Sequence, residues 1–286
     1  MGQPMGRRLV EAGHAVIGYD VLAEARDSAQ SAGLETVADL QTLVGSLDAT
    51  RVIWMMLPAG DPTQAVVAEL SALLSPGDLL VDGGNSDWRD ASPRGLSLGA
   101  TGVHFIDAGV SGGQWGWIDG YGIAVGGPGE DYARIEPVLR ALAAEGAHAH
   151  VGELGAGHFT KAVHNAVEYG VMQAYAEGYA LLRAHPEVDT VETMRVWQQG
   201  CVVRSFLLDQ IVKALQKNPH LKDIGSRVAD SGMGRWTGEE ALRLAVATPV
   251  LTAALHARFV SQDLAHDSAR LLVAARAQIG GHPSHA

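Results

Sequence analysis

Short apolar runs alternate with segments of helical periodicity along the first half of the 286-residue chain. The clearest run, at 51–57, ends at Pro58, and uninterrupted apolar runs are typical of strands buried on both faces. Alternating strands and helices predict an α/β fold with a parallel sheet and right-handed crossovers. The predicted strands are 14–20, 51–57, 78–82, 103–108 and 123–127, and the predicted helices are 5–13, 21–32, 37–47, 62–74, 88–99 and 132–145.

The pattern changes near residue 156, where strand signals stop and helical periods continue to residue 277. The helices expected there are 158–184, 188–199, 201–217, 238–247 and 249–277. No flexible linker separates the two halves, so the helix at 158–184 is expected to join them. The chain therefore divides into a predicted Rossmann-like domain over 1–155 and an all-helical domain over 156–286.

The predicted joining helix carries a polar stripe. Lys161, His164, Asn165 and Glu168 follow one another at i, i+3, i+4 and i+7, so they share one face. A cation, an imidazole, an amide and a carboxylate suit proton transfer and the binding of a polyhydroxy acid. A solvated helix face would show the same spacing. Because residues 171–182 are mostly apolar or small, we expect a buried helix whose stripe faces a cavity.

The charge and composition of the chain limit the kinds of partner that it is expected to bind. The net charge of 21 − 32 = −11 argues against nucleic acid and against an anionic membrane surface, which select basic proteins. The single cysteine, Cys201, permits no internal disulfide and fits a reducing cytoplasm. No stretch reaches the roughly 18 apolar residues that a membrane span needs. The histidines show no metal-ligand spacing, so no metal is expected.

Several candidate ligand contacts follow predicted strands, because ligands of parallel sheets bind outside the carboxyl ends of the strands. Asp20 ends a strand and is interpreted as a ligand of an adenosine ribose hydroxyl, and the alternative is an N-cap of the next helix. Loop 82–86, Asp-Gly-Gly-Asn-Ser, is either a plain turn or a ligand loop. The contacts expected at this edge are Asp20, Leu57, Pro58, Asn85, Ser111, Gly112 and Gly113.

Three further features lie in the second half of the chain. The glycine loop over 230–237 carries Arg235, and its alternative interpretation is a helix connection with Thr237 as N-cap. Arg258 lies in an apolar segment, as either an ion-paired core residue or an anion ligand. His282 would ordinarily be assigned to a disordered tail.

Taken together, these motifs resemble the 6-phosphogluconate dehydrogenase family, in its shorter, NAD-preferring, decarboxylating branch. The most specific match is Lys161-x-x-His-Asn-x-x-Glu-Tyr169, which resembles the catalytic helix of the family. Loops 82–86, 111–113 and 230–237 and the Arg258-Phe pair match as well. The resemblance extends over nearly the whole chain.

The resemblance implies oxidative decarboxylation of 6-phosphogluconate to ribulose 5-phosphate with NAD. It implies that Lys161 is the general base and that Glu168 protonates the enediol. It implies a homodimer or homotetramer whose active sites are shared between subunits. The implied substrate ligands are Asn85, Ser111, Gly112, Gly113, His164, Asn165, Tyr169, Arg235, Arg258, Arg276 and His282, with Met1, Gly2, Asp20, Leu57, Pro58 and Asn85 at the cofactor.

Two alternatives remain at this stage: a β-hydroxyacid dehydrogenase without decarboxylation, and a non-catalytic nucleotide-binding protein. The second is favoured by the N-terminus, which lacks a full Gly-x-Gly-x-x-Gly fingerprint. Met1 and Gly2 resemble the last two residues of that turn, so a first strand and two glycines, roughly ten residues, are expected to be missing. We expect the neighbours of that strand to lose their ladder partners and NAD binding to weaken.

Overall fold

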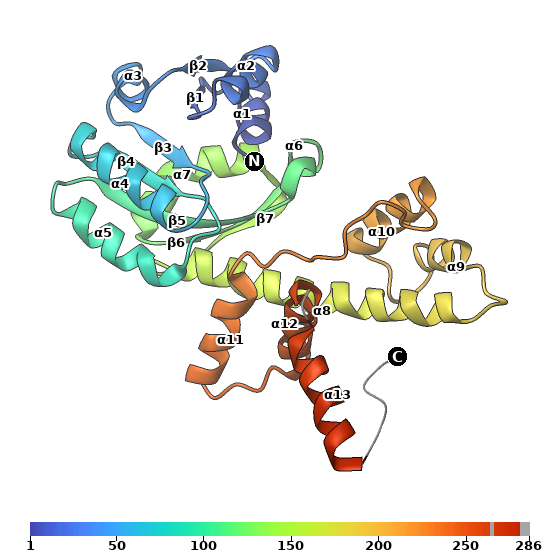
Figure 1. Cartoon of the computed structure of the whole chain (residues 1–286). Coiled ribbons are helices and arrows are strands. Elements are labelled where there is room, and N and C mark those ends of the chain that lie inside the picture. Colours follow the sequence, from blue (N-terminus) through green and yellow to red (C-terminus); the bar gives the residue numbers. More distant parts are fainter. Residues whose placement is uncertain (264–265, 281–286) are drawn as a thin grey trace. The chain divides into compact units, whose positions relative to one another are not determined.

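The structure is a computed structural model that describes residues 1–263 and 266–280 (Figure 1). It contains two compact units, residues 1–164 and the residues from 165 onward. The first unit is a Rossmann-like α/β unit with parallel strands, and the second is helical. The fold class predicted from the sequence is therefore confirmed.

A five-stranded sheet organises the first unit. Its strands lie in chain order: β3 (Val52–Met55), β4 (Leu79–Asp82), β5 (His104–Ser111), β6 (Tyr121–Gly126) and β7 (Ala143–Gly152). Neighbouring strands are parallel except β5 and β6, which are antiparallel. The prediction of an all-parallel sheet is wrong at this pair. The short connection over 112–120, with η2 (Gly113–Trp115) and α6 (Gly116–Asp119), leaves no room for a crossover helix.

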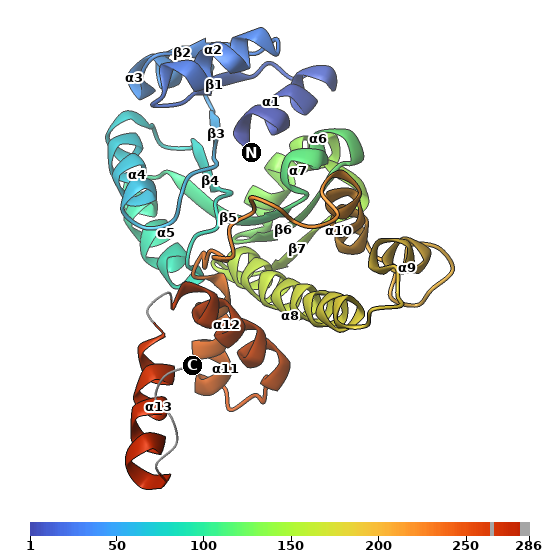
Figure 2. The ribbon, with the colours of Figure 1, turned by 45° about the vertical axis from the view of Figure 1, so that its right-hand side comes forward.

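Two strands form a separate sheet. β1 (Ile17–Tyr19) pairs only with β2 (Glu35–Val37) among the described residues, and the two are parallel. Figure 2 shows them apart from β3, which is an edge strand of the larger sheet. The sequence prediction missed β2 and β7. β2 has only three residues, and β7 is rich in alanine, glycine and histidine, which carry little strand signal.

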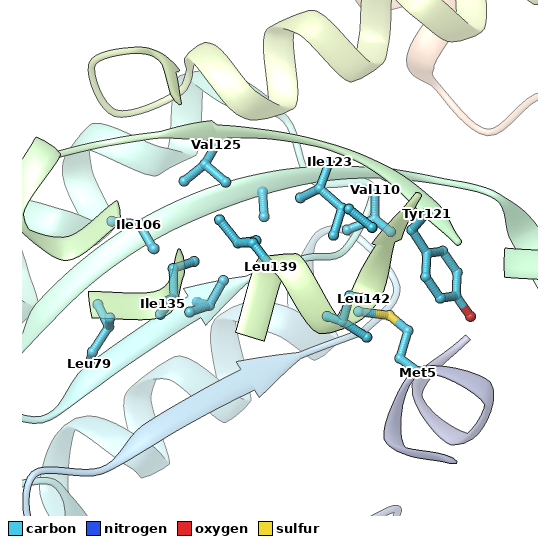
Figure 3. Packing of buried hydrophobic residues seen from close by; sticks show 13 residues of the cluster. Met5, Leu79, Ile106, Val110, Tyr121, Ile123, Val125, Ile135, Leu139 and Leu142 are labelled. Carbon is cyan, nitrogen blue, oxygen red and sulfur yellow. The ribbon is translucent and has the colours of Figure 1, made fainter. Parts of the chain in front are cut away.

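Helices cover both faces of the larger sheet and build two cores. On one face, Ile135, Leu139 and Leu142 of α7 pack with Met5 of α1 against β4, β5 and β6 (Figure 3). On the other face, α3, α4 and α5 supply the apolar side chains. The helices of this unit are α1 (Gly2–Glu11), α2 (Ala23–Ser31), α3 (Leu40–Gly45), α4 (Asp61–Leu73), η1 (Trp88–Asp90), α5 (Ala91–Gly99) and α7 (Gly129–Leu142).

The second unit continues the long helix α8 (Ala156–Ala184), whose first residues belong to the first unit. A small core forms where Met194, Leu208 and Val212 pack with Tyr175 and Tyr179 of α8. The other helices are α9 (Thr190–Trp197), α10 (Phe206–Lys217), α11 (Met233–Arg243), α12 (Pro249–Gln262) and α13 (Asp267–Gly280).

Three sequence expectations in this unit are wrong. The single helix predicted over 249–277 is two helices, and the Asp263 carboxylate accepts a hydrogen bond from the His266 N–H at the break. Thr237 is buried inside α11 rather than at its N-cap. The helix α8 was expected to be buried, but it exposes Val167, Val171 and Met172. The buried side of α8 at this point consists of smaller residues and Tyr169, which periodicity alone did not distinguish.

No helix within residues 1–263 and 266–280 is long and apolar enough to span a membrane.

Candidate active site

The start of α8 is fixed on the sheet by a buried carboxylate. Asp107 of β5 is fully buried, and its two oxygens accept hydrogen bonds from the backbone N–H groups of Gly155 (2.6 Å) and His158 (2.7 Å). The first N–H groups of a helix have no partner within the helix, so a carboxylate there caps the helix and complements its dipole. Asp107 therefore determines where α8 begins, with Lys161 one turn further along.

Glycines allow α8 to lie directly on the strands. A Cβ added to Gly157 would come within 2.7 Å of the carbonyl oxygens of Ala124 and Asp107. A Cβ added to Gly109 of β5 would overlap the Gly157 carbonyl and come within 2.7 Å of the Lys161 Cβ. The close contact between helix and sheet thus depends on absent side chains, and it places Lys161 over Gly109.

Lys161 and His164 line a hollow of about 500 Å³ on the first unit together with Ser111 and Gly112. The Ser111 hydroxyl lies 3.5 Å from His164 Nε2. The other lining residues are Gly109, Gly120, Gly122, Ile123, Ala124, Gly146, Ala147, His148, Ala149 and Thr160. An amine, an imidazole and a hydroxyl thus converge on one space, a combination that suits a hydroxylated ligand.

The glycines of loop 111–113 have a local structural reason. Gly112 has φ +136°, and a Cβ there would lie 2.9 Å from the ring of Tyr121. Gly113 has φ +55°. Both conformations are rare for residues with a side chain, so the loop can pass close to the hollow only with glycine.

Loop 82–86 presents Asn85 to solvent between buried neighbours. The Asp82 carboxylate accepts hydrogen bonds from the Gly84 N–H (3.1 Å) and the Ser86 hydroxyl (2.9 Å), which flank Asn85. Asp82 also pairs with Arg94 at 3.0 Å, and both side chains are almost fully buried. Burial alone would raise the pKa of Asp82. The close approach of His158, the hydrogen bond from Ser86 and the charge of Arg94 hold that pKa below its ordinary value.

The expected cofactor residues lie at two places in the first unit. Asp20, Leu57 and Pro58 follow strands β1 and β3, and Met1 and Gly2 lie at the beginning of α1. α1 has no side-chain cap and no acidic residue in its first turn, so its N-terminal N–H groups are available to a pyrophosphate. Leu57 and Pro58 follow β3, and a Cβ on Gly2 would lie 3.9 Å from Met56, next to Leu57. Asp20 is exposed directly after β1. These residues fit a dinucleotide.

Arg26 is a cationic neighbour of Asp20 that the sequence did not single out. Its guanidinium donates to the main-chain carbonyl of Asp20 at 2.6 Å, while the Asp20 carboxylate accepts from the Leu22 N–H at 2.9 Å. The spacing of six residues between Asp20 and Arg26 matches no local motif, so it gave no signal in the sequence.

A cationic cluster occupies the second unit. The guanidinium carbon of Arg258 lies 3.5 Å from the centre of the Tyr169 ring, and Arg258 donates to the Ala229 carbonyl at 2.7 Å. The Tyr169 hydroxyl is 3.2 Å from the Ser231 hydroxyl. Arg235, more than half exposed, pairs with Asp230 at 2.6 Å. The loop over 230–237 and α12 therefore bring Arg258 together with Tyr169.

The other predicted site residues that the structure describes do not line the hollow. Asn165 and Glu168 lie on α8 within the second unit and are partly exposed. Arg276 is exposed on α13, and His282 lies outside the described residues. Within residues 1–263 and 266–280, no three His, Cys, Asp or Glu side chains gather as a metal site requires.

Comparison with known proteins assigns the family. The family model for the NAD binding domain of 6-phosphogluconate dehydrogenase matches residues 1–152, and that for its C-terminal domain matches residues 157–280. The chain belongs to the 6-phosphogluconate dehydrogenase family.

Relatives within this family differ in length. An enzyme of Haloferax volcanii named 6-phosphogluconate dehydrogenase, NAD(+)-dependent, decarboxylating, is 37% identical over 285 residues, which cover 99% of this chain and 94% of the relative. A decarboxylating 6-phosphogluconate dehydrogenase of Synechococcus elongatus is 35% identical, but the match covers 91% of this chain and 59% of that longer protein.

Solved structures support the same fold. The 6-phosphogluconate dehydrogenase of Plasmodium falciparum, described with NADP+ and with 6-phosphogluconate, matches with a TM-score of 0.82 and 24% identity. That match covers 98% of this chain and 63% of the other. A 3-hydroxyisobutyrate dehydrogenase of Mycobacterium tuberculosis matches with a TM-score of 0.71 at 24% identity, covering 93% and 91%.

In this member of the 6-phosphogluconate dehydrogenase family, the residues that the sequence prediction missed lie beneath the site. Asp107, Arg94 and His158 are each almost fully buried and contact loop 82–86 or the start of α8. Buried charged residues are rare, but a single sequence does not reveal burial, so these three gave no signal.

Proposed function

We propose that this chain oxidises and decarboxylates 6-phosphogluconate to ribulose 5-phosphate and carbon dioxide while NAD is reduced. The observation that carries the proposal is the convergence of Lys161, His164 and Ser111 on one hollow beside loop 111–113. The names of relatives that match nearly the whole chain support the same reaction.

Lys161 is the proposed general base. Its amine takes the proton from the C3 hydroxyl of the substrate. Gly2, Asp20, Leu57 and Pro58 would hold NAD, which would supply the acceptor for the hydride that leaves C3. The resulting 3-keto acid loses carbon dioxide, and the Lys161 ammonium donates a hydrogen bond to the enolate oxygen that develops. Glu168 then donates a proton to C1 of the enediol, which completes ribulose 5-phosphate.

Polar groups from several segments would hold the sugar acid. Ser111, His164 and Asn165 are proposed to bind its hydroxyls and carboxylate, with Asn85 and the N–H groups of Gly112 and Gly113. Tyr169, Arg235 and Arg258 are proposed to bind the phosphate, because arginine pairs with phosphate through two parallel hydrogen bonds.

Arg276 and His282 are proposed to complete a neighbouring subunit's site within a homodimer or homotetramer. The exposed apolar side chains of Val167, Val171 and Met172 on α8 support a partner surface. A mixture of Lys161→Met and Arg276→Ala subunits should regain part of the activity, since some sites would then be intact. Absence of any regain, with a monomer in solution, would contradict shared sites.

NAD is the proposed cofactor because the Asp20 carboxylate would repel the 2′-phosphate of NADP. Arg26 is the observation that favours NADP as the alternative cofactor, since an arginine near the ribose can accommodate the 2′-phosphate. Asp20→Ser should therefore raise kcat/KM with NADP relative to NAD. Arg26→Ala, whose guanidinium is removed, should not raise it.

A panel of substrates and cofactors tests the function. Absorbance at 340 nm is followed with 6-phosphogluconate or 3-hydroxyisobutyrate and with NAD or NADP, and carbon dioxide release is measured alongside. We expect turnover and carbon dioxide only with 6-phosphogluconate, and faster turnover with NAD. Lys161→Met should lose at least ~100-fold of the activity while retaining NAD affinity. Turnover of 3-hydroxyisobutyrate without carbon dioxide would replace this function with that of a non-decarboxylating dehydrogenase.

A further inference from the structure

Loop 82–86 and the first turn of α8 meet at one buried carboxylate. Asp82 Oδ1 accepts from the Gly84 N–H, while Oδ2 accepts from the Ser86 hydroxyl and from Arg94. His158 Nε2 lies 3.4 Å from the same Oδ2. The residue between Gly84 and Ser86 is Asn85, and His158 precedes Lys161 by three positions in α8.

His158 is held from two neighbouring strands. Its backbone N–H donates to Asp107 Oδ2, and its ring approaches Asp82. Asp82 and Asp107 are paired opposite one another in the β4–β5 ladder. Two adjacent carboxylates therefore contact the same turn of α8. Asp107 contacts the backbone of His158, and Asp82 contacts its side chain.

The two ring nitrogens of His158 can form more hydrogen bonds than their surroundings provide. The residue is 1% exposed, and neither ring nitrogen has a well-aligned hydrogen bond within the described chain. The contact with Asp82 is thus a 3.4 Å approach between Nε2 and Oδ2 rather than an aligned hydrogen bond. A buried polar group left in this way destabilises the fold, so an apolar residue would serve stability alone better.

We infer that His158 and Asp82 are positioning residues, which hold Asn85 and Lys161 in a fixed relation by linking loop 82–86 to α8. The inference rests on the proposed function, in which Asn85 binds the substrate and Lys161 takes its proton. Arg94 anchors the same carboxylate from α5, where it also pairs with Asp90 at 3.1 Å. With the His158 ring removed, Asp82 still holds the loop but no longer contacts the helix.

The test compares His158→Leu and His158→Gln with a matched control. His104→Leu is the control, because His104 also pairs with a buried carboxylate of the first unit, Asp131 at 2.8 Å, away from the hollow. His158→Leu should lower kcat by ~100-fold, the loss expected of a displaced catalytic group, with the Kd for NAD within about twofold. His158→Gln, which retains an N–H donor, should recover at least about tenfold of that loss. The control should retain kcat.

Amide hydrogen exchange at Gly84, Asn85 and Ser86 adds a readout that needs no turnover. These amides should exchange faster in His158→Leu than in the wild type and the control, because the loop loses its contact with the helix. Should His158→Leu fail to fold, His158→Gln carries both measurements, with an intermediate kcat and intermediate exchange expected.

Wild-type kcat in His158→Leu, or equal loss of kcat in His158→Leu and His158→Gln with unchanged exchange, would overturn the inference. A wild-type chain that does not turn over 6-phosphogluconate would instead refute the proposed function. In that case the exchange data alone decide whether His158 links the loop to the helix.

Discussion

The two groups of charged residues in this molecule differ in burial. The first group, near the start of α8, consists of Asp82, Asp107 and Arg94. These side chains are almost fully buried, and their partners are other groups of the protein. In the second unit, Arg235 is more than half exposed and Arg258 lies across the Tyr169 ring. Buried charges must be satisfied by the protein itself, whereas exposed cations lose little when they exchange a partner for a ligand.

This difference suggests a division of labour between the two groups. The buried set fixes the geometry of groups that move protons, where an error of about 1 Å can lower the rate ~100-fold. The exposed set is suited to binding an anion that arrives and leaves, since Arg235 can exchange Asp230 for a phosphate. Changes beneath Lys161 should therefore act on kcat, and changes in the cationic cluster should act on KM.

The largest combined effect on kcat and stability is expected from filling the glycine contact under Lys161. In Gly109→Ala the new methyl group would overlap the Gly157 carbonyl and crowd the Lys161 Cβ, so α8 must shift away from the sheet. We expect kcat to fall by ~100-fold and the free energy of unfolding by ~1–3 kcal/mol.

Gly129→Ala provides the matched control for that substitution. Gly129 begins α7, and nothing lies within 4 Å of an added Cβ, so both kcat and stability should remain near the wild-type values. Turnover kinetics and a denaturant titration measure both quantities. An unimpaired Gly109→Ala enzyme would show that the close contact between sheet and helix does not set the position of Lys161.

A moderate effect is expected in the cationic cluster. Arg258→Ala removes a charge-assisted contact worth ~1.5–3 kcal/mol, so KM for 6-phosphogluconate should rise by ~10- to 100-fold while kcat changes little. Arg258→Lys should recover only part of the loss, because lysine does not pair with phosphate in the bidentate way. Arg243→Ala is the control, since Arg243 is exposed on α11 and pairs with Glu240. A fall in kcat alone would contradict the division between the two groups.

The sequence predicted the parts of this site that carry periodicity or motif, and missed those that depend on burial. The stripe from Lys161 to Glu168 and the loops at 82–86 and 111–113 were visible because their spacing and glycines are local features. Asp107 and His158 were invisible, since their roles arise only when β5 and α8 come together. The strand at β6 was predicted, but its antiparallel direction was not, because an apolar run does not encode the direction of a strand.

The smallest effect on activity is expected at the opposite end of β4. Asp78, like Asp82, is a buried carboxylate, but it lies before the strand, away from the carboxyl ends where ligands bind. Burial alone would raise the pKa of Asp78. Hydrogen bonds from the Ser75 and Arg51 N–H groups, and the Arg51 guanidinium at 3.0 Å, bring that pKa below its ordinary value.

A lowered pKa in the folded state has a defined consequence for stability. The stabilisation from Asp78 is fully present above the unfolded-state pKa of about 3.9, and it disappears as the pH falls through the lower folded-state pKa. Asp78→Asn should therefore lower the melting temperature at pH 7 and show a shallower decline than the wild type below about pH 4. Its kcat should stay within about twofold of the wild type, because Asp78 is not among the residues that line the hollow. A large loss of kcat with unchanged stability would mean that the two ends of β4 are not functionally distinct.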